Sequence, residues 1–505
     1  MSDDRAADID RALRQADEAF APYAALPAER RAALLREMVS ELVALGDRLI
    51  DLAHAETALL PARLAGERAR MTGQLEMFAS LVDEGSWVDA RIDTPLPSRT
   101  PAPKPDLRRM LSPLGPVVVF GASNFPLAFC VAGGDTASAL AAGCPVVFKP
   151  HPAHPRTAGL AAEALRRATR TLGLPAGVFS VVEGEHPEVG LGLVRHPLTQ
   201  AVAFTGSLRA GRALWAASAA RSAPIPVYAE MGSVNPLWLL PSALDRHAER
   251  LADAFAASMT LGTGQFCTKP GVVVARQSDA LSRFLFLLAD RLQAVPPARM
   301  LSPALGAAFR SCVSAAAARP GVEVIVSPHG GIADGEAWTL PVVLRTSVRA
   351  LLSDACLLDE MFGPACLVAV AENDAELEGL ARHLPGQLTA TVHGDQADLA
   401  ARPAFLRELQ RRVGRLVFNG FPTGLEVCPS IHHGGPYPAT TDPRTTSVGT
   451  AAIHRFVRPI CFQDCPETLL PVELQDPNPR RIWRLIDGRL TRDAIGRRPG
   501  PPPGP

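Results

Sequence analysis

The first part of the chain carries apolar residues at helical spacing. Apolar and charged positions recur with that period through Ala32–Leu52, and Glu67–Leu81 continues the pattern. We therefore expect helices over residues 7–88. The pattern stops after residue 88, and prolines become dense between positions 91 and 106. Prolines at this density exclude a helix and allow only edge strands or an extended, protruding arm.

Short β-branched runs separated by helical stretches then take over. The predicted strands are Val117–Gly121, Pro145–Phe148, Phe179–Val182 and Ala201–Phe204, and the predicted helices are Ala128–Ala142 and Thr157–Leu172. This alternation is typical of a parallel, doubly wound sheet. Ligands of such sheets lie beyond the carboxyl ends of the strands, where Asn124, Lys149 and the Thr205-Gly206-Ser207 turn fall.

A second α/β segment begins near Ile225 and continues to about residue 424. Its later strands are predicted at Ala365–Val370 and at Arg415–Gly420. Residues 424–460 are loop-rich and contain His432 and His433. The Pro/Gly-rich tail, residues 497–505, is predicted to be disordered.

Composition narrows the class of protein. The 505 residues, 47% of them hydrophobic, can form two to four domains. A formal net charge of zero gives no basic field for nucleic acid or anionic membrane. The nine cysteines form no CxxC pairs, which indicates neither a disulfide framework nor a zinc site. The sequence shows no apolar run of membrane-spanning length and no signal core, so a cytoplasmic protein without a metal is expected.

One decapeptide stands out as a candidate reactive site. It reads Gly262-Thr-Gly-Gln-Phe-Cys-Thr-Lys-Pro-Gly271 and lies between a predicted helix, Ala248–Leu261, and a predicted strand, Val272–Ala275. Glycines let the backbone approach a ligand, and nearby N–H groups can point at a developing negative charge. The site therefore fits a cysteine nucleophile at Cys267. The alternative is a buried structural cysteine, the usual state of this residue inside cells.

Further motifs follow one another in a specific order along the chain. They are Asn124-Phe-Pro126, Phe204-Thr-Gly-Ser207, Glu230-Met-Gly-Ser-Val-Asn-Pro236, Gly264-Gln-Phe-Cys-Thr268 and Glu360-Met-Phe-Gly-Pro364. With this set, the sequence resembles the NAD(P)-dependent aldehyde dehydrogenases from about residue 30 to about residue 490. The stretches Asn419–Gly424 and His433–Thr441 are most similar to one branch, the 2-oxoglutarate-semialdehyde (2,5-dioxovalerate) dehydrogenases.

The resemblance implies an aldehyde dehydrogenase fold: a Rossmann-like cofactor domain, an α/β catalytic domain and a small β oligomerisation arm. The expected boundaries are 1–88 with 112–228 for the cofactor domain, 229–424 for the catalytic domain, 89–111 with 425–470 for the arm and substrate-mouth loops, and 471–505 for the C-terminal segment. It also implies a homodimer or homotetramer.

The same resemblance implies roles for individual residues. Cys267 would be the nucleophile, Glu230 the base that activates water, and Asn124 an oxyanion donor. The cofactor-binding residues would be Lys149, Thr205, Gly206, Ser207, Gly211, Glu360 and Phe362. Lys149 is one of only three lysines, beside Lys104 and Lys269, in a chain that otherwise uses arginine.

Several of these residues also have plainer explanations. Asn124 could cap a helix that begins near Pro126, and Glu230 could be an ordinary solvated carboxylate. Lys269 is expected to have a local structural role. His432 and His433 could ligate a metal, but no third ligand is evident, and loop packing is the preferred reading.

The choice between NADP and NAD stays open, with a lean towards NADP. NAD-preferring members often carry a glutamate at the position of Pro152, where it repels a 2′-phosphate. NADP-specific relatives can place an arginine at the position of Pro187, and His186 or Arg195 could substitute for it here.

The expected reaction is oxidation of 2-oxoglutarate semialdehyde to 2-oxoglutarate through a thiohemiacetal and a thioester on Cys267. Arg444 is the first candidate for binding the substrate carboxylate, and Arg156 is the second. The alternatives are a medium- or long-chain fatty aldehyde dehydrogenase, a CoA-acylating enzyme, a cofactor-free cysteine hydrolase and a non-catalytic protein of the same fold. Glu230 argues against CoA acylation, and retention of both Cys267 and Glu230 argues against loss of catalysis.

Overall fold

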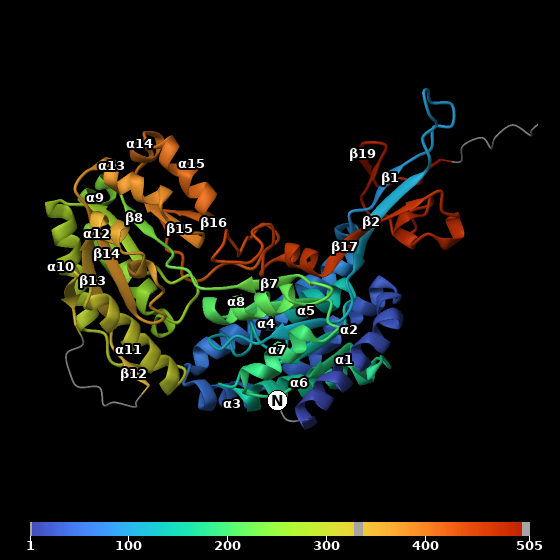
Figure 1. Ribbon diagram of the computed structural model, residues 1–505, viewed down its shortest axis with the longest axis horizontal. Coiled ribbons are helices and arrows are strands. Elements are labelled where there is room, and N and C mark those ends of the chain that lie inside the picture. The colour runs from blue at the N-terminus through green and yellow to red at the C-terminus, as the bar shows by residue number, and fades with distance from the viewer. Residues whose placement is uncertain (1–2, 328–336, 497–505) are drawn as a thin grey trace, which may run out of the picture.

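The computed structural model describes residues 3–327 and 337–496 (Figure 1). The first of its sheets is parallel, with the strand order β5-β4-β3-β6-β7. Its strands are β3 (Val117–Phe120), β4 (Val146–Lys149), β5 (Phe179–Val181), β6 (Ala201–Thr205) and β7 (Val227–Glu230). Its helices are α1 (Asp3–Ala24), α2 (Ala28–Val43), α3 (Asp47–Thr57), α4 (Pro61–Glu84), α5 (Gly134–Ala142), α6 (Pro155–Thr171), α7 (Pro187–Arg195) and α8 (Leu208–Ala219). The four predicted strands are confirmed to within one residue at each end.

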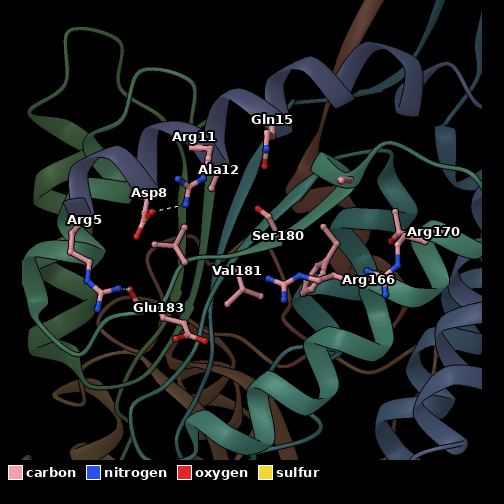
Figure 2. Close-up of a pocket in the computed structure, with 14 residues that line it drawn as sticks. Arg5, Asp8, Arg11, Ala12, Gln15, Arg166, Arg170, Ser180, Val181 and Glu183 are labelled. Carbon is pink, nitrogen blue, oxygen red and sulfur yellow. Dashed lines mark hydrogen bonds and ion pairs between the residues drawn. The ribbon is translucent and has the colours of Figure 1, made fainter. Parts of the chain in front are cut away.

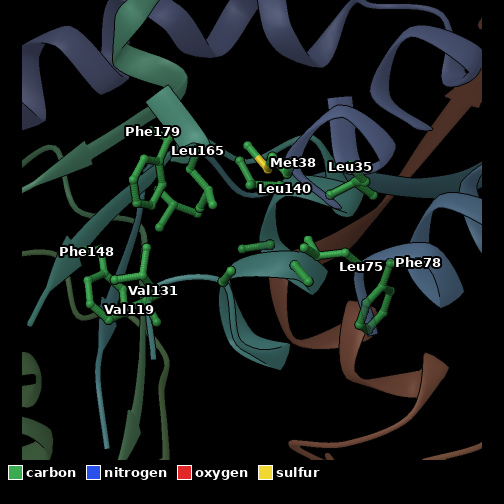
Figure 3. Close-up of a cluster of buried hydrophobic side chains, with 14 of the residues drawn as sticks. Leu35, Met38, Leu75, Phe78, Val119, Val131, Leu140, Phe148, Leu165 and Phe179 are labelled. Atoms are coloured by element: carbon green, nitrogen blue, oxygen red, sulfur yellow. The ribbon is translucent and has the colours of Figure 1, made fainter. Parts of the chain in front are cut away.

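Alternate residues of β3 point to opposite faces of this sheet. Val117 and Val119 pack in a buried cluster with α2, α4, α5 and α6, shown in Figure 3. Val118 and Phe120 pack in a second cluster with α1, α7 and α8. Because both faces are covered, the strand is apolar throughout rather than alternating with polar residues.

The helix predicted over Ala128–Ala142 is shorter than expected and begins only at Gly134. The preceding residues form turns, and a Cβ added at Gly133 would lie 2.7 Å from the carbonyl oxygen of Ala128. In that turn, the Glu67 carboxylate of α4 accepts hydrogen bonds from the backbone N–H groups of Leu127 and Ala128. The turn therefore replaces helical hydrogen bonds with bonds to a buried carboxylate.

The second sheet has the order β11-β13-β14-β9-β8-β15-β16, and its strands are parallel except for the antiparallel edge strand β11. Its strands are β8 (Leu237–Leu239), β9 (Val272–Arg276), β11 (Glu323–Val326), β13 (Val342–Ser347), β14 (Ala365–Ala371), β15 (Gln387–His393) and β16 (Val413–Phe418). Its helices are α9 (Pro241–Thr260), α10 (Asp279–Gln293), α11 (Pro303–Ala317), α12 (Val348–Ser353), α13 (Asp374–Gly379), α14 (Gln396–Ala400) and α15 (Pro403–Arg412). A two-stranded pair, β10 (Ala298–Arg299) with β12 (Trp338–Thr339), lies beside it.

A third sheet forms an arm that projects from the rest of the molecule (Figure 1). Its order is β17-β2-β1-β18-β19. Its strands are β1 (Arg91–Asp93), β2 (Leu107–Pro113), β17 (Val457–Gln463), β18 (Arg484–Ile486) and β19 (Arg489–Thr491). The proline-dense segment contains no helix and lies in the projecting arm, as the sequence predicts, with β1 followed by turns and an isolated bridge between Leu96 and Lys104. The chain after residue 471 adds two strands to the same sheet. The predicted disordered tail lies outside the described residues.

The described part of the chain contains no helix that is both long and apolar enough to span a membrane.

A buried ion pair links the segment that leads into the arm to α5, a helix that covers the first sheet. Arg455 lies in the short 3₁₀ helix Thr450–Phe456, and its guanidinium donates a hydrogen bond to Asp135 of α5. Only 4% of the Arg455 side chain and 9% of the Asp135 side chain are exposed. Removal of one partner would leave the other charge buried and unpaired, which costs about 3–5 kcal/mol.

We therefore expect Arg455→Ala to lower the melting temperature by roughly 3–5 °C in a thermal unfolding experiment. The matched control is Arg349→Ala, because Arg349 pairs with Glu372 and Glu376 at the surface. An exposed pair is worth at most about 1 kcal/mol, so the control should shift the melting temperature by less than about 1 °C. Equal shifts in the two variants would contradict this assignment.

Candidate active site

The loop that carries Cys267 follows α9 and contains three consecutive residues with left-handed backbone: Gly262, Thr263 and Gly264. A Cβ added at Gly264 would lie 2.3 Å from the backbone carbonyl carbon of Gly363. Glycine is therefore required for two reasons, the positive φ and the close approach of two backbones. The glycines were expected to let the backbone approach a ligand, whereas at Gly264 the close neighbour is the backbone of the segment that follows Glu360.

Two buried polar side chains, Lys269 and Asn235, connect the cysteine loop to neighbouring backbone by hydrogen bonds. Lys269 donates hydrogen bonds to the carbonyl oxygens of Met361 (3.1 Å) and Ala365 (2.6 Å). Asn235, from the motif that begins at Glu230, donates to the carbonyl oxygens of Cys267 (2.8 Å) and Lys269 (3.1 Å). The expected structural role of Lys269 is thus confirmed, and the Glu230 and Glu360 motifs are both fastened to the cysteine loop.

Glu230 is the last residue of β7, an edge strand of the first sheet. A segment from far along the chain covers this edge. Met231 donates its N–H to the carbonyl oxygen of Ala439 (2.7 Å), and Thr441 donates its own to that of Ala229 (3.1 Å). The unpaired groups of the strand are thereby satisfied.

The same segment also packs against the second sheet through glycines. A Cβ added at Gly435 would lie 2.1 Å from the carbonyl oxygen of Gln387, and one added at Gly414 would lie 2.1 Å from that of Gly434. His433 stands at the start of this pair of glycines. The Gly-Gly sequence therefore allows the loop to pass closely between the two sheets and to bring His433 to the end of β7.

His433 lies between Cys267 and Glu230. Its Nε2 is 3.4 Å from the Cys267 sulfur, and its Nδ1 makes a short hydrogen bond with the Glu230 carboxylate. The other Glu230 oxygen accepts a hydrogen bond of 2.8 Å from the Ser447 hydroxyl. His433 and Glu230 are both buried, whereas Cys267 is half-buried. A thiol, an imidazole and a carboxylate in this order form the arrangement that activates a cysteine nucleophile.

The charge on His433 follows from its neighbours. Burial alone would lower the pKa of His433, but the negative charges of Glu230 and Cys267 outweigh it and raise that pKa to about 10. At neutral pH the imidazole is therefore protonated. A fixed positive charge therefore lies within hydrogen-bond distance of the Cys267 sulfur.

Asn124 also faces the cysteine loop. Its side-chain amide donates one hydrogen bond to the carbonyl oxygen of Gln265 (3.0 Å) and retains a second donor. The alternative role as a cap of a helix at Pro126 is excluded, because α5 begins only at Gly134 with Gly133 as its cap.

A cavity of about 290 Å³ connects these groups. Eight of the ten predicted site residues line it: Asn124, Thr205, Gly206, Ser207, Glu230, Cys267, Glu360 and Phe362. Lys149 and Gly211 are outside its lining. Lys149 lies at the end of β4 with its ammonium bonded to the carbonyl oxygen of Pro150 (3.1 Å), and Gly211 lies on α8 against Met231.

The cavity has the features of a site for a polar, flat ligand. The Thr205 hydroxyl is buried and has no hydrogen-bond partner among the described residues. Gly232 leaves room for the Glu360 carboxylate, because a Cβ there would lie 2.6 Å from Oε2. Burial raises the pKa of Glu360, and the ammonium of Lys269 opposes this shift. These groups suit the hydroxyls and amide of a nicotinamide nucleotide.

A larger cavity, of about 440 Å³, lies between α1, α6 and β5 (Figure 2). None of the predicted site residues lines it. Three of the four arginines that line it have local partners: Arg11 pairs with Asp8, Arg170 pairs with Glu163, and Arg5 donates to the carbonyl oxygen of Glu183. We therefore place the chemistry at the smaller cavity, which contains the cysteine.

Sequence reasoning missed the part played by His433. Loop packing was preferred for it, yet its ring contacts both Cys267 and Glu230. A signal existed, since a nucleophilic cysteine needs a base and His433 stands among glycines, but 166 positions separate it from Cys267. Within residues 3–327 and 337–496, no group of three metal-ligating side chains is found.

The two arginines proposed for the substrate carboxylate are misplaced. The Arg444 side chain is 86% exposed and is paired with Asp442. Arg156 lies at the exposed start of α6. No periodicity or spacing in the sequence supported either assignment. Only the folded chain shows that both arginines lie at the surface.

Comparisons with known proteins show which family and which enzymes this chain resembles. The aldehyde dehydrogenase family profile matches residues 1–437. Alpha-ketoglutaric semialdehyde dehydrogenase 2 of Azospirillum brasilense is 48% identical over 483 residues, which are 96% of this chain and 92% of that protein. Alpha-ketoglutaric semialdehyde dehydrogenase of Acinetobacter baylyi is 44% identical over 487 residues, with coverage of 96% and 92%.

Solved structures show the same fold. A 3,6-anhydro-L-galactose dehydrogenase, 24% identical, superposes with a TM-score of 0.76 and covers 91% of this chain and 92% of its own. Lactaldehyde dehydrogenase from Escherichia coli, 21% identical, has a TM-score of 0.77 with 91% of each chain covered.

The geometry predicts how the Cys267 thiol reacts with a neutral alkylating agent such as iodoacetamide. Because His433 stays protonated up to about pH 10, its effect on the alkylation rate should be present throughout pH 7 to pH 9. In His433→Asn the rate at pH 7 should fall by roughly tenfold or more and rise with pH, since an ordinary thiol is only a few per cent thiolate at neutral pH. His432→Asn is the matched control and should behave as the wild type. Alkylation that is unchanged in His433→Asn would exclude the ion pair.

Proposed function

The chain belongs to the aldehyde dehydrogenase family, and we propose that it oxidises 2-oxoglutarate semialdehyde (alpha-ketoglutaric semialdehyde) to 2-oxoglutarate with NADP or NAD. The observation that carries the chemistry is the contact of His433 with both Cys267 and Glu230 at the edge of the cavity. The two relatives at 48% and 44% identity, both named for this substrate, support the choice of aldehyde.

In the first half of the reaction, the Cys267 thiolate adds to the aldehyde carbon. A C–S bond forms and the carbonyl electrons move to oxygen, while the thiol proton stays on His433. The second amide N–H of Asn124 is available to stabilise the oxyanion, and one such donor is typically worth about 10²–10³ in rate. The bound nicotinamide would supply the acceptor for the hydride that leaves this carbon, and a thioester on Cys267 results.

In the second half, Glu230 takes a proton from water, and the hydroxide attacks the thioester. The C–S bond breaks, the carboxylic acid leaves, and the thiolate returns to its partner His433. Each Glu230 oxygen retains a lone pair beyond its bonds to His433 and Ser447, so the carboxylate can serve as this base. The roles proposed for Cys267, Glu230 and Asn124 from the sequence are kept, and His433 joins them as a fixed cation.

The residues that line the cavity would hold the nicotinamide half of the cofactor. We assign its ribose hydroxyls to Glu360 and its ring to the space beside Thr205 and Phe362. Lys149, at the end of β4, would bind the adenosine ribose. Arg195 pairs with Glu188 at 3.7 Å, an exposed pair that a 2′-phosphate could replace. This arrangement supports the lean towards NADP.

The substrate assignment is tested by steady-state kinetics, followed by the absorbance of reduced nicotinamide. We expect 2-oxoglutarate semialdehyde to exceed hexanal and decanal in kcat/KM by well over tenfold, because a lost carboxylate contact costs more than the ~1–3 kcal/mol per methylene of an apolar funnel. Equal kcat/KM on fatty aldehydes would contradict the substrate assignment but not the mechanism.

The same assay carries its own control for the mechanism. Cys267→Ala should lose more than about a thousandfold in turnover with every aldehyde while it still binds the cofactor. Cys428→Ala removes another half-buried cysteine and should keep its activity. A cofactor-free hydrolase, the remaining alternative, would show no dependence on nicotinamide.

We further propose that the arm pairs with other subunits in a homodimer or homotetramer. The arm sheet ends in two edge strands, β17 and β19, which offer unpaired backbone groups. Its surface also exposes large apolar side chains: Leu96, Leu469, Val472, Trp483 and Leu490. Exposed apolar groups gathered on one projecting element are typical of an interface. The domain boundaries given above belong to this proposal, with the change that residues 484–491 are assigned to the arm, because β18 and β19 lie in its sheet. A cytoplasmic location is also proposed, and nine free cysteines accord with it.

Light scattering at micromolar concentration should therefore find dimers or tetramers. Leu490→Asp places a charge on the arm, where Leu490 is 66% exposed, and should weaken assembly by at least about tenfold. Phe286→Asp is the control, because Phe286 is 75% exposed on α10, outside the arm. A stable wild-type monomer, or equal weakening by both substitutions, would contradict the proposal.

A further inference from the structure

Two arginines of α4 lie over the aromatic residues next to the reacting groups. The guanidinium carbon of Arg70 is 5.0 Å from the ring centroid of Phe129 and 5.5 Å from that of Phe125. The guanidinium carbon of Arg63 is 4.8 Å from the Phe125 ring and 4.5 Å from the Phe266 ring. Phe125 directly follows the proposed oxyanion donor, and Phe266 directly precedes the proposed nucleophile.

The two guanidiniums differ in what they bind. Arg63 donates to the carbonyl oxygen of Asn124 (2.9 Å) and lies 3.9 Å from the Glu67 carboxylate. Arg70 has no such commitment: its Nε and Nη2 are buried and have no hydrogen-bond partner among the described residues. A buried guanidinium with two unpaired donors is costly, because each lost hydrogen bond to a charged group is expensive.

The charge of Arg70 acts on the reacting groups. Burial lowers the pKa of Arg70, and Cys267 is the largest of the neighbouring groups that oppose this shift, with Glu230 also contributing. Arg415 is the other arginine that interacts with Cys267, but it donates to the carbonyl oxygens of Pro422 (2.7 Å) and Gly424 (3.4 Å). Of these arginines, Arg70 is therefore the one with donors to offer a ligand.

We propose that the fork of Arg70 binds the carboxylate at the far end of the substrate, while the rings of Phe125 and Phe129 enclose its carbon chain. A guanidinium presents parallel N–H groups that match a carboxylate. In a five-carbon semialdehyde, four C–C bonds of about 1.5 Å place the carboxylate roughly 5–6 Å from the aldehyde carbon. This inference rests on the proposed function, since it assumes an anionic aldehyde.

Arg63 has a supporting part in this arrangement. Its hydrogen bond to the Asn124 carbonyl orients the residue whose amide faces Cys267, and its Nη1 would lie 2.4 Å from a Cβ at Gly262. Arg63 thus links α4 to both sides of the site and is a positioning residue with one unpaired donor, Nη1, whereas Arg70 has two, Nε and Nη2.

The test compares two substrates of equal length. Glutarate semialdehyde carries a carboxylate and pentanal does not, and both have five carbons. In Arg70→Met, kcat/KM for glutarate semialdehyde and for 2-oxoglutarate semialdehyde should fall by roughly 10- to 100-fold, because one charge-assisted pair is lost. The value for pentanal should stay within about threefold of wild type. Arg70→Lys keeps the charge without the fork and should fall between the two.

The controls separate this role from others. Arg68→Met alters an arginine of the same helix that donates to the carbonyl oxygen of Gly46, and it should leave both substrates unaffected. If Arg70 instead activated the thiol, Arg70→Met would slow pentanal as much as the semialdehydes and would slow alkylation of Cys267 by iodoacetamide. That result would overturn the inference, as would loss of the preference in Arg415→Met but not in Arg70→Met.

The proposed anionic substrate and the proposed role of Arg70 can be contradicted separately. A wild-type enzyme that oxidises pentanal as well as glutarate semialdehyde would contradict the proposed anionic substrate. A wild-type preference for the semialdehyde that survives in Arg70→Met would leave the proposed function standing and would exclude Arg70 as its carboxylate-binding residue.

Discussion

The close passage of one loop between two sheets is the constraint on which the active site depends. The loop that begins at His433 pairs with the edge of β7 on one side and meets Gly414 and the carbonyl of Gln387 on the other. Side chains at Gly414 or Gly435 would push the loop and the second sheet apart. Glycine therefore fixes the separation of the sheets, and that separation sets the distance between His433 and Cys267.

Side-chain hydrogen bonds to backbone carbonyl oxygens make the cysteine loop rigid. Asn235 and Lys269 hold the cysteine loop to the Glu230 and Glu360 motifs with buried donors, and each donor ends on a carbonyl oxygen. Such bonds depend on chain geometry rather than on the substrate, so the loop is shaped before a ligand arrives. Preorganisation of this kind is what allows a single amide or cation to stabilise a transition state effectively.

The sequence predicted features that arise from local patterns. The strands of the first sheet follow from apolar runs such as Val117–Phe120, and the glycines around Cys267 indicated a close approach of backbone. The start of α5 was wrong because Glu67, distant in the sequence, satisfies the turn before it. His433 was undervalued and Arg70 was not considered, since both derive their importance from neighbours that no spacing along the chain reveals. Arg444 failed for the same reason, as only the folded chain shows that it faces solvent.

The distance along the chain between Cys267 and His433 has a consequence for biosynthesis. The ribosome completes the cysteine loop long before it makes the segment that contains the imidazole, at 166 positions further on. Until that segment inserts, the thiol lacks both the imidazole and the carboxylate that the imidazole holds in line with it. The complete thiol–imidazole–carboxylate arrangement thus exists only in a finished chain.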